Sequence, residues 1–324
     1  MSRRLIPVLI AAALALGACT SVTPTAVPAD PNDSSSASAP APSGSASATP
    51  ATCDNATTSF APDGGLPSPD ALPAGSTMAQ IRDRGRLIVG VSADTLLLGS
   101  RNPISGQIEG FDIDLARAIG QAILGPNATV QLRVITAAQR VPLLESGEID
   151  IVVRNMTMNC DRWTKVNFSA VYYQAGQKIL VRKGSDITGL AGLTGRRVCA
   201  PAGSTSLSNL QRLAPEAEAV PATNHTGCLV ALQQGDVDAI TGDDTVLAGL
   251  ASQDPYAVVL QGDPITAEPY GVAIPKGNVD LARFVNAVLA QRIADGTWQA
   301  SYDQWLAPTL GAGAPPTPSY GRTS

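Results

Sequence analysis

The residues best suited to bind a small charged molecule lie at the ends of two predicted strands. Arg154 and Asn155 stand at the end of the strand predicted at residues 149–154, and Gly242 and Asp243 hold the matching places in a later strand. Ligands of open α/β sheets bind outside the carboxyl ends of the strands. A guanidinium binds a carboxylate through two hydrogen bonds, and a carboxylate accepts from an ammonium group. We therefore predict a cleft that binds a small zwitterion.

Hydroxyl groups and a further guanidinium complete this candidate site. Thr157 and Arg162 follow the first of the two strand ends, and Ser204 and Thr205 follow a strand predicted to begin near residue 198. Hydroxyl and backbone N–H groups add donors for a carboxylate. The predicted ligand-binding set is Ser92, Arg154, Asn155, Thr157, Arg162, Ser204, Thr205 and Asp243.

The elements that must position these residues alternate between strand and helix. Residues 87–91, 130–135 and 149–154 are predicted strands, and residues 110–119 and 139–146 are predicted helices. Asp112 is placed to cap the first helix. This alternation is typical of an α/β fold with a parallel-rich sheet.

A helix-Gly-strand phrase occurs twice. Residues 144–152 and 232–240 each end a helix, pass through Gly147 or Gly235, and open a strand. Glycine suits the left-handed position after a helix. The strand openings at residues 85–89 and 195–199 also correspond. Two lobes of similar plan are the simplest interpretation, although helix-Gly-strand connections are common in α/β proteins.

Composition excludes several classes of function. His225 is the one histidine among 324 residues, so sites that need two or more histidines are excluded, while a single Ser/His/Asp set remains formally possible. A net charge of -5 argues against a nucleic-acid binder. No Cys-x-x-Cys pair occurs, so a metal site is not expected. We also expect no cofactor.

The N-terminus reads as a secretory signal. Ser2-Arg3-Arg4 precedes an apolar run at residues 5–16, which is too short to span a membrane as a mature helix. The run Leu16-Gly17-Ala18-Cys19 resembles the bacterial lipobox, which implies lipidation of Cys19 and anchoring to the outer face of the cell membrane. Ordinary cleavage after Ala18 is the alternative. Of residues 20–52, 27 are Ser, Ala, Pro or Thr, which predicts a flexible tether.

Four further cysteines indicate two disulfides on the oxidising side of the membrane, with three possible pairings. Cys199 and Cys228 both lie in the second lobe and are expected to pair there. That leaves Cys53 with Cys160, a bond that would join the end of the tether to the first lobe beside Arg162. Free buried cysteines are the alternative.

The motifs together resemble a known family. They are 110-GFDID-114, Leu144-x-x-Gly147-x-x-Asp150, 155-NMTMNCDR-162, Phe168-Ser169 with Tyr172-Tyr173, 203-GSTS-206, Asp238-Ala239 with Asp243, 268-EPYG-271, and 295-DGTW-298 with Trp305. In order and spacing, the chain from about residue 87 to 305 resembles the polar-amino-acid-binding proteins of ABC importers, family 3 of the periplasmic binding proteins. With the lipobox, it is most similar to actinobacterial glutamine/glutamate-binding lipoproteins.

This resemblance implies a two-lobed, type II fold with two hinge crossings, near residues 173–177 and 268–271. The lobes close around an amino acid, and a monomer delivers it to an ABC permease with a cytoplasmic ATPase. The predicted segments are a signal peptide (1–18), the lipidated cysteine and flexible tether (19–76), lobe 1 (77–174), lobe 2 (175–270), the return to lobe 1 (271–310) and a loose tail (311–324).

The resemblance also assigns roles within the site. It implies that Arg162 binds the ligand's α-carboxylate with help from Thr157 and Thr205, while Asp243 and the carbonyl of Asn155 take the α-ammonium. A surface ion pair is the alternative role for Arg162, and a helix cap the alternative for Asp243.

Departures from the family pattern bear on the substrate. Asn159 replaces a threonine, Arg154 replaces a small residue, and Ser92-Ala93-Asp94-Thr95 stands where many glutamine binders have an acid and an aromatic. A buried side-chain carboxylate needs a cation, whereas an amide gains from an acceptor. We therefore expect glutamate or aspartate to be preferred over asparagine or glutamine. Arg101, in a predicted loop, is expected to be solvated.

Two other functions remain open at this level. An enzyme on the same scaffold, such as a dehydratase, would need an acid or base, and Glu268 or Asp94 could serve. His225, near Cys228 and away from the predicted cleft, is expected to be structural. A sensor subunit would bind the same ligand but signal through a membrane receptor instead of feeding a permease.

Overall fold

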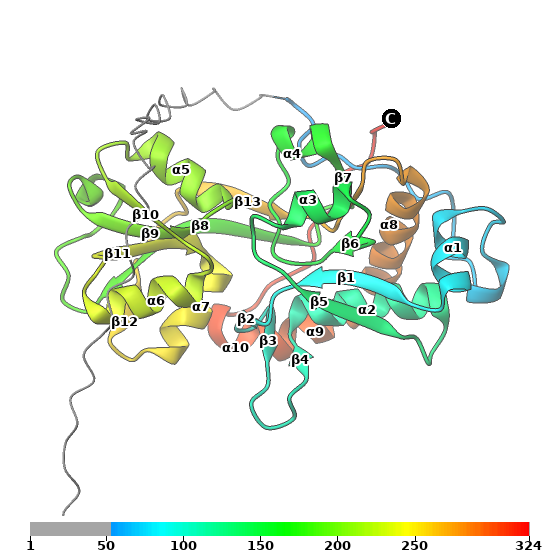
Figure 1. Cartoon of the computed structure of the whole chain (residues 1–324), viewed down its shortest axis with the longest axis horizontal. Coiled ribbons are helices and arrows are strands. Elements are labelled where there is room, and N and C mark those ends of the chain that lie inside the picture. Colours follow the sequence, from blue (N-terminus) through cyan, green and yellow to red (C-terminus); the bar gives the residue numbers. More distant parts are fainter. Residues whose placement is uncertain (1–52, 324) are drawn as a thin grey trace, which may run out of the picture. The chain divides into compact units, whose positions relative to one another are not determined.

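The computed structural model describes residues 53–323. The predicted signal peptide, Cys19 and the tether at residues 20–52 lie outside the described residues. Within the described part, two mixed sheets form the two lobes, and each is flanked by helices (Figure 1).

Lobe 1 is built on a five-stranded sheet with the order β5-β1-β6-β14-β7. Its strands are β1 (Leu87–Val91), β5 (Val130–Val134), β6 (Ile151–Val152), β7 (Val166–Phe168) and β14 (Ala273–Pro275). Strand β1 pairs in parallel with β5 and β6, and the returning strand β14 pairs antiparallel with β6 and β7. The parallel strands lie within the ranges that the sequence predicts, although β6 is shorter than expected. Strands β1 and β6 are largely buried, whereas the edge strand β5 is partly exposed.

The helices of lobe 1 come from both ends of the chain. They are η1 (Pro69–Ala71), α1 (Thr77–Arg84), α2 (Phe111–Leu124), α3 (Arg140–Glu145), α4 (Cys160–Lys165), α8 (Val279–Ala294), α9 (Thr297–Trp305) and α10 (Ala307–Leu310). A small antiparallel sheet of β2 (Asp94–Thr95), β3 (Gly99–Arg101) and β4 (Ile108–Glu109) extends from the start of this lobe.

Lobe 2 repeats the plan with a sheet in the order β10-β9-β11-β8-β12. Its strands are β8 (Tyr173–Arg182), β9 (Arg197–Pro201), β10 (Glu218–Ala222), β11 (Ala239–Asp243) and β12 (Ala257–Val259), and its helices are η2 (Leu190–Leu193), α5 (Thr205–Leu213), α6 (His225–Gln234) and α7 (Asp244–Gln253). The helix-Gly-strand connection from which two similar lobes were predicted is present in both: α3 leads through Gly147 to β6, and α6 leads through Gly235 to β11. Gly147 and Gly235 have φ values of 71° and 85°, which glycine adopts without steric cost.

The chain crosses between the lobes on two paired strands. Strand β8 leads into lobe 2, and β13 (Thr266–Tyr270) leads back, with Tyr270 opposite Tyr173. These strands coincide with the two crossings implied by the family resemblance. Glu268 lies in the middle of the return strand and is 1% exposed.

The structure differs from the prediction of a flexible tether up to residue 76 and a loose tail from residue 311. Residues 53–76 and 311–323, at the two ends of the described chain, both pack onto lobe 1. Phe60 is fully buried, and Ser59 forms a β-bridge with Tyr320. Arg322 lies over the ring of Trp163, 3.7 Å from its centroid. The low charge and high Pro, Gly and Ser content suggested disorder, but a few apolar and aromatic side chains are enough to fasten these segments.

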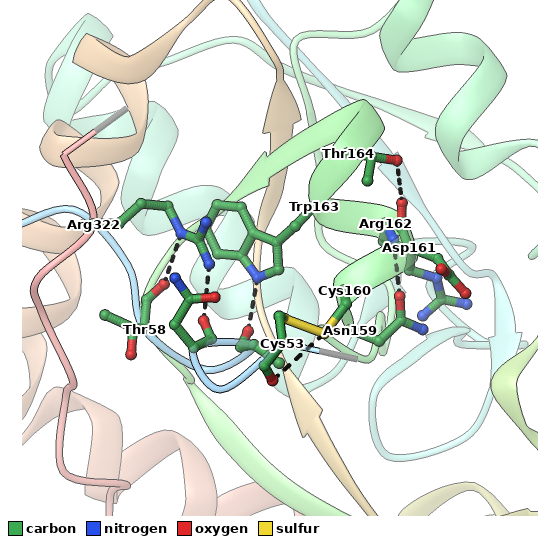
Figure 2. The surroundings of a disulfide bond; sticks show 11 residues. Cys53, Thr58, Asn159, Cys160, Asp161, Arg162, Trp163, Thr164 and Arg322 are labelled. Atoms are coloured by element: carbon green, nitrogen blue, oxygen red, sulfur yellow. Dashed lines mark hydrogen bonds between the residues drawn. A yellow bond between two sulfur atoms is a disulfide. The ribbon is translucent and has the colours of Figure 1, made fainter. Parts of the chain in front are cut away.

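Two disulfides join the same cysteines that were expected to pair. Cys53–Cys160 links the N-terminal segment to the first residue of α4, and Cys199–Cys228 links β9 to α6 in the core of lobe 2. The Trp163 indole N–H also donates to the Ala56 carbonyl at 2.7 Å. Figure 2 shows the Cys53–Cys160 disulfide and the Trp163 hydrogen bond beside Asn159 and Arg162.

Candidate functional site

A small enclosed cavity lies where strand ends from both lobes meet. Its walls come from β2, the loops after β5 and β6, the end of β9 with the start of α5, and α6 and β11. The residues that line it are Thr95, Ala137, Arg140, Arg154, Asn155, Pro201, Ser204, Thr205, Ser206, His225 and Asp243. The structure thus brings together Arg154, Asn155, Ser204, Thr205 and Asp243 from the predicted set.

Asp243 supplies the negative charge of this cavity. The Tyr270 hydroxyl donates to its Oδ2 at 2.7 Å. Among the described residues, its Oδ1 is one of the few buried polar side-chain atoms without a hydrogen-bond partner. Burial, followed by repulsion from Glu268, raises the pKa of Asp243 to about 7. Asp243 precedes α7, but its side chain makes no capping hydrogen bond to that helix, so the capping alternative does not hold.

Arg154 is a buried cation that lines the same cavity. Only 6% of its surface is exposed, and its Nε also lacks a hydrogen-bond partner within the described part of the chain. Burial lowers the pKa of Arg154, while Asp94 and Asp112 act in the opposite direction. Asp94 comes from the stretch 92–95 that departs from the glutamine-binder pattern, and its charge acts on Arg154, although no hydrogen bond or ion pair within the described residues joins the two. Ser92 lies outside the cavity wall and donates to Asp94 Oδ1 at 2.7 Å.

Arg140 is a site residue that the sequence interpretation missed. Its guanidinium donates to the carbonyls of Ala137, Arg154 and Asn155 in lobe 1, and to that of Gly203 in lobe 2 at 3.2 Å. Burial lowers its pKa well below the ordinary value. Its position just beyond the strand at 130–134 could have identified it, by the same strand-end rule that identified Arg154.

The two lobes approach each other closely beside Arg140. A Cβ on Gly203 would lie 2.7 Å from the Cα of Ala138, so a larger residue would force the lobes apart at this point. Gly203 also has a φ of 73°. This position therefore needs glycine for both space and backbone conformation.

Asn155 has an unusual backbone, with a φ of 34°. Its N–H donates to Asp112 Oδ2 at 2.8 Å, and Tyr172 donates to the other oxygen of the same carboxylate. The expected capping role of Asp112 is therefore wrong: α2 begins after Gly110, and the Asp112 carboxylate instead holds the turn at Asn155. Burial raises the pKa of Asp112 to about 6. A strained turn held this firmly fits a binding loop.

Arg162, Thr157 and Thr205 meet in an open groove that adjoins the cavity at Ser204 and Thr205. Arg162 donates to the Thr157 carbonyl at 2.6 Å and to the Gly203 carbonyl at 3.4 Å. Burial lowers the pKa of Arg162 to about 10, against the attraction of Glu268 and Asp243. Arg162 therefore contacts backbone carbonyls of both lobes.

Ser204 and His225 have structural contacts of their own. The Ser204 hydroxyl caps α5 by accepting from the Leu207 N–H at 3.1 Å. His225 was expected away from the cleft, but it lines the cavity, with Nε2 3.3 Å from the Thr241 carbonyl oxygen. Burial lowers the pKa of His225 to about 4, which makes it a neutral side chain at physiological pH.

The donor groups of the described residues suit an organic ligand. No group of three His, Cys, Asp or Glu side chains there could hold a metal ion. No helix in the same part of the chain is both long and apolar enough to cross a membrane. Two lobes joined by paired crossing strands around a polar cavity define the class of two-lobed solute receptors.

The family follows from comparison with known proteins. Residues 87–308 match the model of the bacterial extracellular solute-binding proteins, family 3, and the chain belongs to that family.

Two curated relatives and one solved structure illustrate the similarity. The ABC transporter glutamine-binding protein GlnH of Bacillus subtilis is 42% identical over 71% of this chain and 84% of its own length. The glutamate-binding protein GluB of Corynebacterium efficiens is 33% identical over 67% and 77%. An ancestral amino-acid-binding protein, a precursor of cyclohexadienyl dehydratase, is 34% identical, with a TM-score of 0.66 over 71% of this chain and 99% of its own.

Proposed function

We propose that this protein captures an acidic amino acid, glutamate or aspartate, and delivers it to an ABC importer. The observation that carries the proposal is a set of three buried polar atoms in the wall of the enclosed cavity that have no hydrogen-bond partner within the described residues. Arg154 Nε is an unused donor, and Asp243 Oδ1 and Asn155 Oδ1 are unused acceptors. Because burying an unpaired charged group is costly, these atoms favour a ligand that carries both signs. The cavity itself has a volume of only about 20 Å³, so a whole amino acid would also occupy the adjoining groove of about 680 Å³.

Each charge of the ligand then has a protein partner. Arg162, beside Thr157 and Thr205, binds the α-carboxylate, and Asp243 accepts from the α-ammonium. Arg154 remains for a second carboxylate on the ligand side chain. The cavity wall itself carries Arg140 and Arg154 as cations and Asp243 as its one carboxylate.

A side-chain amide is the competing ligand. Asp94 offsets part of the charge of Arg154, and the relative from Bacillus subtilis is named a glutamine-binding protein. An amide could accept from Arg154 without bringing a second negative charge near Asp94. The preference therefore depends on how much of the charge of Arg154 is neutralised by Asp94: the more complete the neutralisation, the more an amide is favoured over a carboxylate.

Isothermal titration calorimetry tests the proposal. The protein is first unfolded to remove any copurifying ligand and is then refolded. Glutamate or aspartate should bind more tightly than glutamine and asparagine. Tightest binding of glutamine would overturn the acidic preference while leaving amino-acid capture in place. Absence of binding to all four would overturn the function itself.

We also infer that Cys19 is lipidated and holds the protein at the outer face of the membrane. Support comes from the Leu-Gly-Ala-Cys run and from the extracellular character of the family. Cells fed a tagged fatty acid should label the wild type but not Cys19→Ala. Equal labelling of both would contradict lipidation of Cys19.

An enzymatic role for Glu268 has little support in the geometry. Both oxygens of its carboxylate accept hydrogen bonds from neighbouring side chains, so neither is placed as an available base. The two curated relatives above are named as binding proteins.

A further inference from the structure

Glu268 gathers four side-chain donors around one buried carboxylate. Its Oε2 accepts from Thr157 Oγ1 and Thr205 Oγ1, each at 2.7 Å. Its Oε1 accepts from Asn209 Nδ2 at 2.9 Å and Thr266 Oγ1 at 2.7 Å. The first threonine belongs to lobe 1, whereas the second lies on α5 of lobe 2, so one oxygen atom connects the lobes.

The donors on Oε2 are the hydroxyls that the proposed function assigns to the ligand. Thr157 and Thr205 stand beside Arg162 in the groove that also contains Glu268. A hydroxyl has one hydrogen to donate, so it cannot serve Glu268 and a ligand carboxylate at once. The two carboxylates would also repel each other near the same guanidinium.

We propose that Glu268 is an internal competitor for the ligand's α-carboxylate. This inference rests on the proposed function. Before binding, Glu268 supplies the negative charge that balances Arg162 and draws the lobes together through Thr157 and Thr205. On binding, the α-carboxylate takes over these hydroxyls, and Glu268 keeps its contacts with Asn209 and Thr266.

Such a competitor sets the affinity below what the site could reach. Part of the binding free energy is used to displace Glu268 from its donors and to offset the repulsion between the two carboxylates. A receptor that must hand over its ligand benefits, because the returning carboxylate favours release.

The test compares the wild type with Glu268→Gln by calorimetry, using the amino acid that binds the wild type most tightly. Removing the competing charge should lower Kd about tenfold. The matched control is Asp244→Asn, which removes a partly buried carboxylate next to Asp243 that accepts a hydrogen bond from the Thr245 N–H. Its Kd should change far less than that of Glu268→Gln.

An unchanged or weaker affinity in folded Glu268→Gln would overturn the proposal, because a carboxylate that merely supports the site can only weaken binding when it is removed. Thermal melting establishes that the variant is folded. If it is not, Glu268→Asp decides: its shorter side chain keeps the charge but withdraws it from the threonines, so its Kd should fall below the wild-type value. An equal or higher Kd overturns the proposal. A wild type that binds no amino acid would instead refute the proposed function.

Discussion

The two lobes contribute different charges to the candidate site. Lobe 1 supplies the buried cations Arg140 and Arg154 together with Arg162, whereas β11 of lobe 2 supplies Asp243, and the return strand β13 supplies Glu268. The groove also contains Asp161 of lobe 1 and Arg212 of lobe 2, which have the reverse signs. The lobes share an α/β plan and the helix-Gly-strand phrase, so the fold itself does not dictate this difference. It arises from side chains at the strand ends.

This division explains how a small ligand can hold two lobes together. A zwitterion has its carboxylate and ammonium on one carbon atom, so it can satisfy a cation of one lobe and an anion of the other only when the lobes are closed. A ligand shifts a conformational equilibrium only as far as it binds one state better. The opposite charges provide that difference.

Removal of Arg162 should have the largest effect on this arrangement. Arg162→Met leaves the ligand's α-carboxylate without its cation, and loss of one partner of a buried charge pair costs about 2–5 kcal/mol, or at least about 30-fold in Kd. Calorimetry measures the loss. Arg212→Met is the matched control, since Arg212 lines the same groove but donates to Asn209 at its exposed side. Similar losses in both variants would show that Arg162 has no special role.

Protonation of Asp243 should produce the next largest effect. The ammonium binds the ionised carboxylate, and the raised pKa of about 7 means that this form is lost as the pH falls through neutrality. Affinity should therefore fall below pH 7, by at most about tenfold per pH unit. Calorimetry between pH 5.5 and 8.5 tests this. Asp243→Asn should bind weakly at every pH; a wild-type profile that is equally flat would contradict the role of Asp243.

Arg154 should affect the choice of ligand more than the overall affinity. Arg154→Met keeps an unbranched apolar stem but removes the guanidinium and its charge, so glutamate and aspartate should lose about tenfold relative to glutamine and asparagine. Arg101→Met removes an exposed arginine of β3 and serves as the control. If acidic amino acids and their amides lose affinity equally, Arg154 does not distinguish a side-chain carboxylate from an amide.

The disulfides offer the mildest test of the difference between the lobes. Cys53 is exposed and Cys160 partly so, whereas Cys199 and Cys228 are 1% and 0% exposed. A low concentration of thiol should therefore reduce the lobe 1 disulfide first, with only a small loss of affinity. Alkylation followed by intact mass and peptide mapping gives the order of reduction. Earlier labelling of the lobe 2 pair would contradict this expectation.

Several parts of the site were predictable because they depend on local sequence. Parallel strands predict where polar side chains gather, and Arg154, Asn155 and Asp243, which were predicted from their positions at strand ends, line one cavity in the structure. Arg140 obeys the same rule but was overlooked. Its role depends on carbonyl groups from both lobes, and no local pattern reports those contacts.

The packed ends of the chain show the opposite limit. Residues 53–76 and 311–323 have the composition of linkers, yet Phe60 and Arg322 attach them to lobe 1. Composition averages over a segment, whereas attachment depends on a few side chains that find partners far away in the sequence.

The sequence by itself determined the α/β class, the two related lobes, the family and most of the charged residues at the strand ends. These follow from hydrophobic periodicity, glycine positions and motif spacing, which are local properties. Three features were decided only by the tertiary structure. The charge of Asp94 acts on Arg154, His225 lines the cavity, and Glu268 accepts hydrogen bonds from the hydroxyls of Thr157 and Thr205. Those relations join residues of different lobes or distant segments, and their energies exist only when folding brings the charges together and removes water from between them.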